Sequence, residues 1–171
     1  MNAKIKADTA FQQDGAGPVV VLIHGLGLNM DMWQWQLDAL LQHFTVLRYD
    51  LLGHGDSIKP KGAYTMPQMV DQLHRLIDAQ GHQHCVVIGF SLGGLIAKAF
   101  TLAHPDRVSA LVVMNSAHAR TDEQRAGIML RVEQCRADGP GTTVSDALAR
   151  WFSTGFIENN PETIEKVRQW V

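Results

Sequence analysis

The stretch Ile88-Gly-Phe-Ser-Leu-Gly-Gly94 decides how this sequence folds and where its chemistry lies. It holds the pattern G-x-S-x-G, from Gly89 to Gly93, between an apolar run and a small-residue helical pattern over 92–103. A serine on a sharp strand-to-helix turn needs glycine two residues to either side, because a Cβ there would collide with the neighbouring strand or helix. The pattern therefore predicts a strained turn that presents the hydroxyl of Ser91 as a nucleophile.

A second motif, His24-Gly-Leu-Gly27, directly follows another apolar run. Acyl transfer needs N–H donors aimed at the developing oxyanion, one from the residue after the nucleophile and one from a loop after an earlier strand. We therefore expect the N–H groups of Leu92 and Leu26 to form an oxyanion hole. His24 and Gly25 are candidate pocket residues at the same turn, where the histidine is expected to act as a hydrogen-bonding support.

Apolar runs alternate with helical patterns through the first two thirds of the chain. Near-continuous β-branched runs suit strands buried on both faces, so the alternation predicts an α/β fold with a mostly parallel sheet and helices on both faces. Two short segments around 4–7 and 10–13 suggest an opening hairpin. Strands are expected over 19–24, 44–50, 85–90 and 108–116, and helices over 31–43, from Thr65 to Gly81 and over 92–103.

The alternation stops after the strand expected over 108–116. Three helical patterns follow, over 122–138, after Thr143 and from Pro161, and no strand returns. We expect residues 1–118 to form the core without its last strands, and 119–171 to form an incomplete helical lid. The third lid helix lacks a stop signal, which suggests a chain truncated at its C-terminus. Candidate pocket walls in the lid are aromatic: Trp151, Phe152 and Phe156.

Three segments carry a resemblance to a known family. HGLGLNMDMW (24–33), RYDLLGHGDS (48–57) and VIGFSLGGLIAKAFTLAHPDRVSALVVMNSA (87–117) resemble the α/β-hydrolase fold superfamily. The lid spacing and RWFSTGF (150–156) resemble the 3-oxoadipate enol-lactonases and carboxylesterase-like members. The resemblance implies that Ser91 is the nucleophile and that backbone N–H groups stabilise the oxyanion.

The partners of the nucleophile are the missing part of this pattern. In this fold the triad runs in the order serine, acid, histidine, and the family places the last two after strands that do not follow here. His118, after the strand over 108–116, is a candidate pocket residue rather than an expected base. His82 and His84 have no second group of ligands nearby in the sequence, so no metal is expected. The chemistry implies no cofactor.

The favoured function is a serine hydrolase that cleaves a carboxylic ester or a lactone through an acyl-enzyme, with the acid and histidine missing from this chain. One alternative is a catalytically incomplete fragment or a non-enzymatic assembly partner. Another keeps the serine but changes the reaction, to perhydrolysis, acyl transfer or carbon–carbon bond hydrolysis. The sequence does not separate these reactions, because they differ mainly in pocket residues and water access.

Composition narrows the choice of partners. A net charge of −2 without a basic cluster argues against nucleic acid, and the apolar runs are too short to cross a membrane. Cys85 and Cys135 lie far apart and predict reduced thiols in a cytoplasmic protein. Without further strands, the strand over 108–116 would be an exposed apolar edge, so a homodimer or strand exchange through that edge is expected.

Overall fold

A computed structural model describes residues 8–139, 141 and 144–170. The chain divides into two compact units, Met1–Ser116 and Ala117–Val171, and the boundary falls two residues before the expected one.

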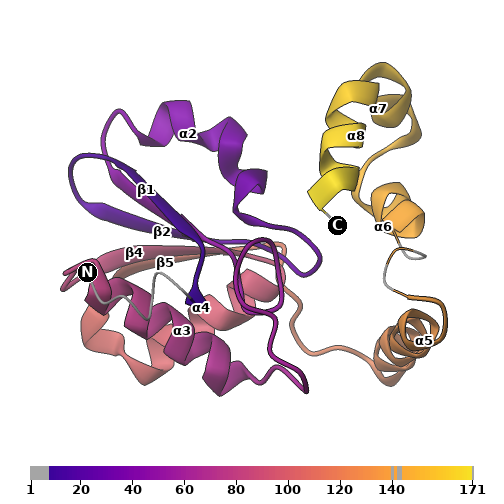
Figure 1. The fold of residues 1–171 in the computed structure, drawn as a ribbon, viewed down its shortest axis with the longest axis horizontal. Coiled ribbons are helices and arrows are strands. Elements are labelled where there is room, and N and C mark those ends of the chain that lie inside the picture. Colours follow the sequence, from indigo (N-terminus) through magenta and orange to yellow (C-terminus); the bar gives the residue numbers. More distant parts are fainter. Residues whose placement is uncertain (1–7, 140, 142–143, 171) are drawn as a thin grey trace. The chain divides into compact units, whose positions relative to one another are not determined.

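The first unit is built on a five-stranded sheet with the strand order β1-β3-β2-β4-β5 (Figure 1). Strands β2 to β5 pair in parallel, and β1 pairs antiparallel with β3. The expected opening hairpin is therefore wrong for residues 10–13, which join β3, while residues 4–7 lie outside the described part. The strands are β1 (Phe11–Gly15), β2 (Val19–Ile23), β3 (Thr45–Tyr49), β4 (Cys85–Phe90) and β5 (Val108–Met114).

Helices cover both faces of this sheet, as the sequence predicts. Alternate residues of β2 enter different cores, because successive side chains of a strand point to opposite faces. Val21 and Ile23 pack with residues of α3 (Met66–Ala79) and α4 (Leu92–Ala103). Val20 and Leu22 pack with Trp33 and with partly buried side chains of α2 (Gln34–Leu40). The β-branched run 19–23 is thus apolar throughout because both of its faces are covered.

The helix expected over 31–43 is shorter and begins differently. Its first turn is the 3₁₀ helix η1 (Met30–Trp33), and regular α-helix follows only from Gln34. Asn29 caps η1, since its side-chain oxygen accepts the N–H of Asp31. A second 3₁₀ helix, η2 (Pro105–Arg107), links α4 to β5.

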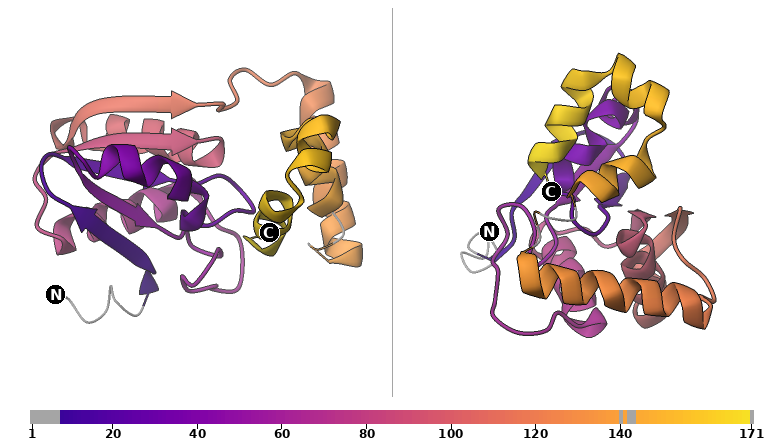
Figure 2. Two further views of the ribbon diagram at one scale, coloured as in Figure 1. Left: turned by 90° about the horizontal axis from the view of Figure 1, so that it is seen from above. Right: turned by 90° about the vertical axis from the view of Figure 1, so that its right-hand side faces the viewer.

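Strand β5 forms one edge of the described sheet, as the left view of Figure 2 shows for the outer salmon strand. Most of its residues are exposed, in contrast to the buried β2 and β3. Its apolar side chains Leu111, Val112, Val113 and Met114 are between 37% and 43% exposed. In the described part of the chain, this strand therefore presents apolar side chains and a free edge to solvent.

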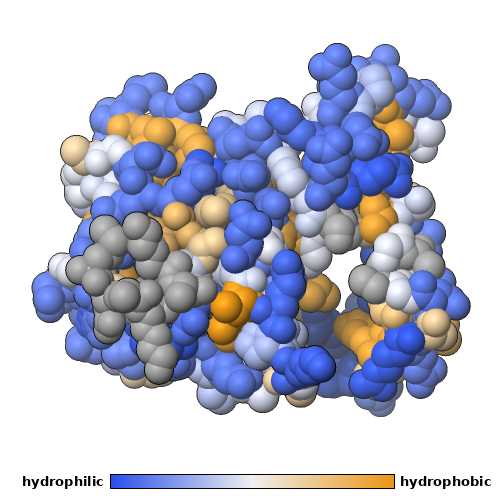
Figure 3. Space-filling model, viewed as in Figure 1, coloured by the Kyte–Doolittle hydropathy of each residue, from blue (hydrophilic) through white to orange (hydrophobic). Residues whose placement is uncertain are grey.

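The second unit is helical, with one helix more than expected among the residues described. A short helix, α7, lies between the second and third expected helices. Apolar side chains remain exposed here, among them Met129, Leu130, Trp151 and Phe156, and Figure 3 shows apolar patches between hydrophilic residues over this unit. The helices are α5 (Asp122–Asp138), α6 (Val144–Trp151), α7 (Thr154–Asn159) and α8 (Pro161–Trp170).

No helix in the described ranges combines the length and apolar character that a membrane span requires.

Candidate active site

Ser91 lies on the turn between β4 and α4, in a backbone conformation that non-glycine residues rarely adopt. Its φ is 53° and its ψ is −112°. The Ser91 N–H donates to Met114 O over 2.9 Å, and the Ser116 hydroxyl donates to Ser91 O over 2.8 Å. The end of β5 therefore holds the strained turn from one side. Such strain persists only where the surroundings over-determine it, and it is concentrated at functional sites.

The flanking glycines make this turn sterically possible. A Cβ on Gly89 would lie 2.2 Å from Gly93 O, and one on Gly93 would lie 2.3 Å from Ile23 O. Both distances are far below a van der Waals contact. The steric requirement predicted for the G-x-S-x-G pattern is confirmed, since strand and helix approach each other too closely for any side chain.

Leu92 is the first residue of α4, directly after Ser91. The first N–H groups of an α-helix have no partner inside the helix, and they carry the positive end of its dipole. The Leu92 N–H is such a group. It is therefore available to an oxygen that develops negative charge beside Ser91.

The turn after β2 lies against the serine. A Cβ on Gly25 would lie 3.5 Å from the Cβ of Ser91 and 3.0 Å from the ring of Phe90. Leu28 N–H donates to Gly25 O over 3.3 Å and closes the turn, and Leu26 at its tip is 66% exposed. The structure thus brings the second predicted donor loop beside the predicted nucleophile.

His24 is fully buried, so it does not line an open pocket, and its expected role as a hydrogen-bonding support is confirmed. Its Nδ1–H donates to Gly25 O over 2.8 Å, and its Nε2 accepts the Leu51 N–H over 2.9 Å. These bonds fix one neutral tautomer, and burial lowers the pKa of His24 to about 4. With both nitrogens engaged, the imidazole supports the turn and is not free to take a proton.

Asp50, which the sequence did not single out, also holds neighbouring turns in place by accepting backbone N–H groups. It is 2% exposed, and its two carboxylate oxygens accept the N–H groups of Met30 (2.8 Å) and Asp56 (2.9 Å). Burial raises the pKa of Asp50 above its usual value, and the two N–H bonds act against that change. Its position at the end of β3, beside a glycine-rich turn, was the only signal in the sequence.

No hydrogen bond joins the Ser91 hydroxyl to a histidine or carboxylate within residues 8–116. Three other histidines of this unit bond elsewhere: His54 with Leu52 O, His82 with Gln13, and His84 with Asp106 O. His74 and His104 stack on each other with ring centres 4.2 Å apart. The first unit therefore supplies the serine and the donors but no base in contact with them.

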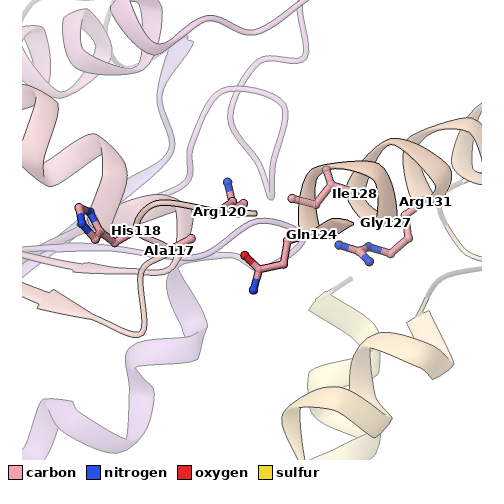
Figure 4. Close-up of a pocket in the computed structure, with 7 residues that line it drawn as sticks. All are labelled: Ala117, His118, Arg120, Gln124, Gly127, Ile128 and Arg131. Atoms are coloured by element: carbon pink, nitrogen blue, oxygen red, sulfur yellow. The ribbon is translucent and has the colours of Figure 1, made fainter. Parts of the chain in front are cut away.

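The remaining predicted residues lie in the second unit. His118 lines a depression of about 410 Å³, shown in Figure 4. The rings of Phe152 and Phe156 stack with centres 5.2 Å apart, and Trp151 is 38% exposed. Among the residues that the structure describes, no cluster of histidine, cysteine and carboxylate side chains is arranged to hold a metal ion.

A mostly parallel sheet with a strained serine at the head of a helix defines one class of fold. A family model described as the alpha/beta hydrolase fold matches residues 18–136, and the chain belongs to this family.

Individual relatives are hydrolases. The 3-oxoadipate enol-lactonase 2 of Acinetobacter baylyi is 33% identical over 150 residues, which cover 88% of this chain and 55% of that protein. The crystal structure of an enol-lactonase from Burkholderia xenovorans LB400 is 32% identical with a TM-score of 0.87, over 95% of this chain and 63% of that one. A thermophilic esterase from Thermogutta terrifontis is 33% identical with a TM-score of 0.87, over 95% and 61%. The chain thus spans less than two thirds of the length of these relatives.

Proposed function

We propose that this chain carries the nucleophile and the oxyanion hole of a serine hydrolase that cleaves a carboxylic ester or a lactone. The single observation that carries the proposal is the Ser91 turn, with a φ of 53° at the first turn of α4. The similarity to an enol-lactonase and an esterase supports the ester or lactone as substrate class.

In the proposed reaction, Ser91 Oγ bonds to the acyl carbon while its proton passes to a general base. The carbonyl oxygen becomes an oxyanion, which the N–H groups of Leu26 and Leu92 stabilise. Collapse breaks the ester bond, the leaving alcohol takes the proton, and an acyl-enzyme remains. Water then releases the acid and restores Ser91.

The base and its acid are proposed to lie in the part of the relatives' length that this chain does not span. The geometry around Ser91 supports this, because no histidine of the first unit bonds to the serine hydroxyl. We also propose a cytoplasmic location, because the sequence holds only two cysteines, far apart and without a C-x-x-C pair.

A fluorophosphonate probe tests the nucleophile directly. We expect labelling at Ser91 in the native protein that supplies the base, loss of labelling in Ser91→Ala, and full labelling in Ser109→Ala, a matched control on β5. If the 171-residue chain is not labelled at all, it has no activated serine of its own.

The intact mass of the native protein then separates the alternatives. A mass above 18.9 kDa would point to a longer protein that supplies the base, whereas a mass equal to 18.9 kDa would favour a non-catalytic role.

A further inference from the structure

The depression in the second unit is built by two short stretches of chain. Residues 117–120 form one side, and the first turns of α5 form the other (Figure 4). Along α5, the lining residues follow the spacing i, i+3, i+4, i+7, so they share one face of the helix. These four are Gln124, Gly127, Ile128 and Arg131.

Three of the four polar side chains that line this depression, Arg120, Gln124 and Arg131, present hydrogen-bond donors, and His118 is the fourth. The Oε1 atom of Gln124 already accepts the Thr121 N–H over 3.0 Å, which leaves its NH₂ group to face outward. Arg120 and Arg131 carry guanidinium groups, which have only donors. Among the described residues, neither arginine has a carboxylate within ion-pair distance, whereas Arg125 on another face of α5 pairs with Asp122.

No carboxylate lines the depression. Asp122 and Glu133 fall on the opposite side of α5 by helical spacing, and Asp138, which shares the face, lies seven residues beyond Arg131 at the end of the helix. The floor is partly apolar, since Ile128 contributes its side chain and Gly127 contributes none. A Cβ at Gly127 would meet only the Arg131 guanidinium, at 3.9 Å, so the floor is open there. Unpaired cations beside an apolar floor favour an anion that has a hydrocarbon part.

We propose that this face of α5 binds the carboxylate of a small organic acid. A guanidinium matches a carboxylate with two parallel hydrogen bonds, so Arg131 and Arg120 hold the charged end. The Gln124 NH₂ adds a donor, and Ile128 contacts the hydrocarbon part. This binding site goes beyond the proposed hydrolase function and does not require Ser91 to react.

Titration of the 171-residue chain with succinate, followed by amide chemical shifts, tests the site. We expect shifts at the start of α5 and a dissociation constant that rises about tenfold in Arg131→Gln and in Arg120→Gln, because each loses a charged pair of hydrogen bonds. Arg136→Gln removes the same charge from another face of α5 and should leave binding unchanged. Arg131→Lys should retain part of the affinity. Succinamide, which has the same shape without charge, should not bind.

The proposal would be overturned if succinate did not bind, or if the Arg131→Gln and Arg120→Gln variants bound it as well as the unmodified chain. Equal binding of inorganic phosphate would also overturn it, because that result would indicate a site for any oxyanion. Circular dichroism of each variant verifies that α5 remains folded. The test is separate from that of the proposed function, since succinate binding is read without catalysis and fluorophosphonate labelling is read without succinate.

Discussion

His24 accepts the backbone N–H of Leu51 over 2.9 Å, and this bond joins the turn after β2 to the turn after β3. The same ring donates to Gly25 O, so it sets the direction of the peptide that precedes Leu26. The orientation of a proposed oxyanion donor thus depends on a buried, neutral imidazole. Protonation of Nε2 would remove its lone pair and break the bond to Leu51.

Stability should therefore fall in mildly acidic solution. Burial lowers the pKa of His24 from 6.5 to about 4 in the folded protein, so between these values the unfolded chain binds a proton that the folded chain does not. The free energy of unfolding then rises with pH across this window, and roughly 3 kcal/mol is lost as the pH falls from 6.5 to 4. Urea unfolding at a series of pH values measures this slope.

The contribution of His24 can be separated from those of other groups. Burial also lowers the pKa of His54, which acts in the same direction, while the raised pKa of Asp50 acts in the opposite one. His24→Asn should flatten the profile between pH 4 and 6.5, and His43→Asn, at an exposed position, should not. An unchanged slope in His24→Asn would contradict the assignment.

Gly93→Ala should destabilise the first unit strongly. Its Cβ would lie 2.3 Å from Ile23 O and 2.6 Å from His24 O, and backbone atoms cannot yield as a side chain can. We expect a loss of about 3 kcal/mol or more in the free energy of unfolding, measured by urea denaturation. Gly155→Ala is the matched control, because a Cβ there meets nothing within 4 Å and lies in α7. A Gly93→Ala variant as stable as the wild type would contradict the close approach of β2 and α4.

Arg107 should contribute more to the free energy of unfolding than arginines that form exposed ion pairs. Its guanidinium donates to Asp78 (2.7 Å), His82 O (2.7 Å) and Gln83 O (2.8 Å), and its side chain is only 15% exposed. Arg107→Ala leaves these acceptors without their donor and should cost about 2 kcal/mol of unfolding free energy. Arg75→Ala breaks an exposed i,i+4 pair with Asp71 and should cost roughly 0.5 kcal/mol or less. Equal losses in the two variants would contradict the role of Arg107.

The main elements were predictable because their physical causes act locally in the sequence. The strand over 85–90 and the helices over 92–103 and 122–138 have the predicted bounds, since the strand is a continuous apolar run and each helix ends shortly before a proline or glycine that stops it. Helix α7 was missed because six residues after the Ser153 cap are too few to display an apolar period.

The hydrogen bonds that hold the turns around the candidate site in place were harder to predict. Asp50 acts through the backbone N–H groups of Met30 and Asp56, which any residue type could supply, so no side-chain pattern reveals the contact. His24 was placed at the correct turn, but its burial depends on the turn after β3, which the local sequence does not show. The turn that carries Ser91 was predictable, because the backbone packs so closely at Gly89 and Gly93 that only glycine fits there.

The edge strand β5 leads to a last prediction, on self-association. Its unpaired backbone groups and its apolar side chains, including Val112 at 42% exposure, form a template on which another strand can pair. We expect the sedimentation coefficient of the 171-residue chain to rise with concentration. Val112→Lys should abolish the rise, since a charge on an edge strand opposes pairing. Leu102→Lys, on α4 at a site that is 84% exposed, adds the same charge away from the edge and should leave association unchanged. Association that persists in Val112→Lys, or that Leu102→Lys abolishes equally well, would show that contacts other than β5 hold the copies together.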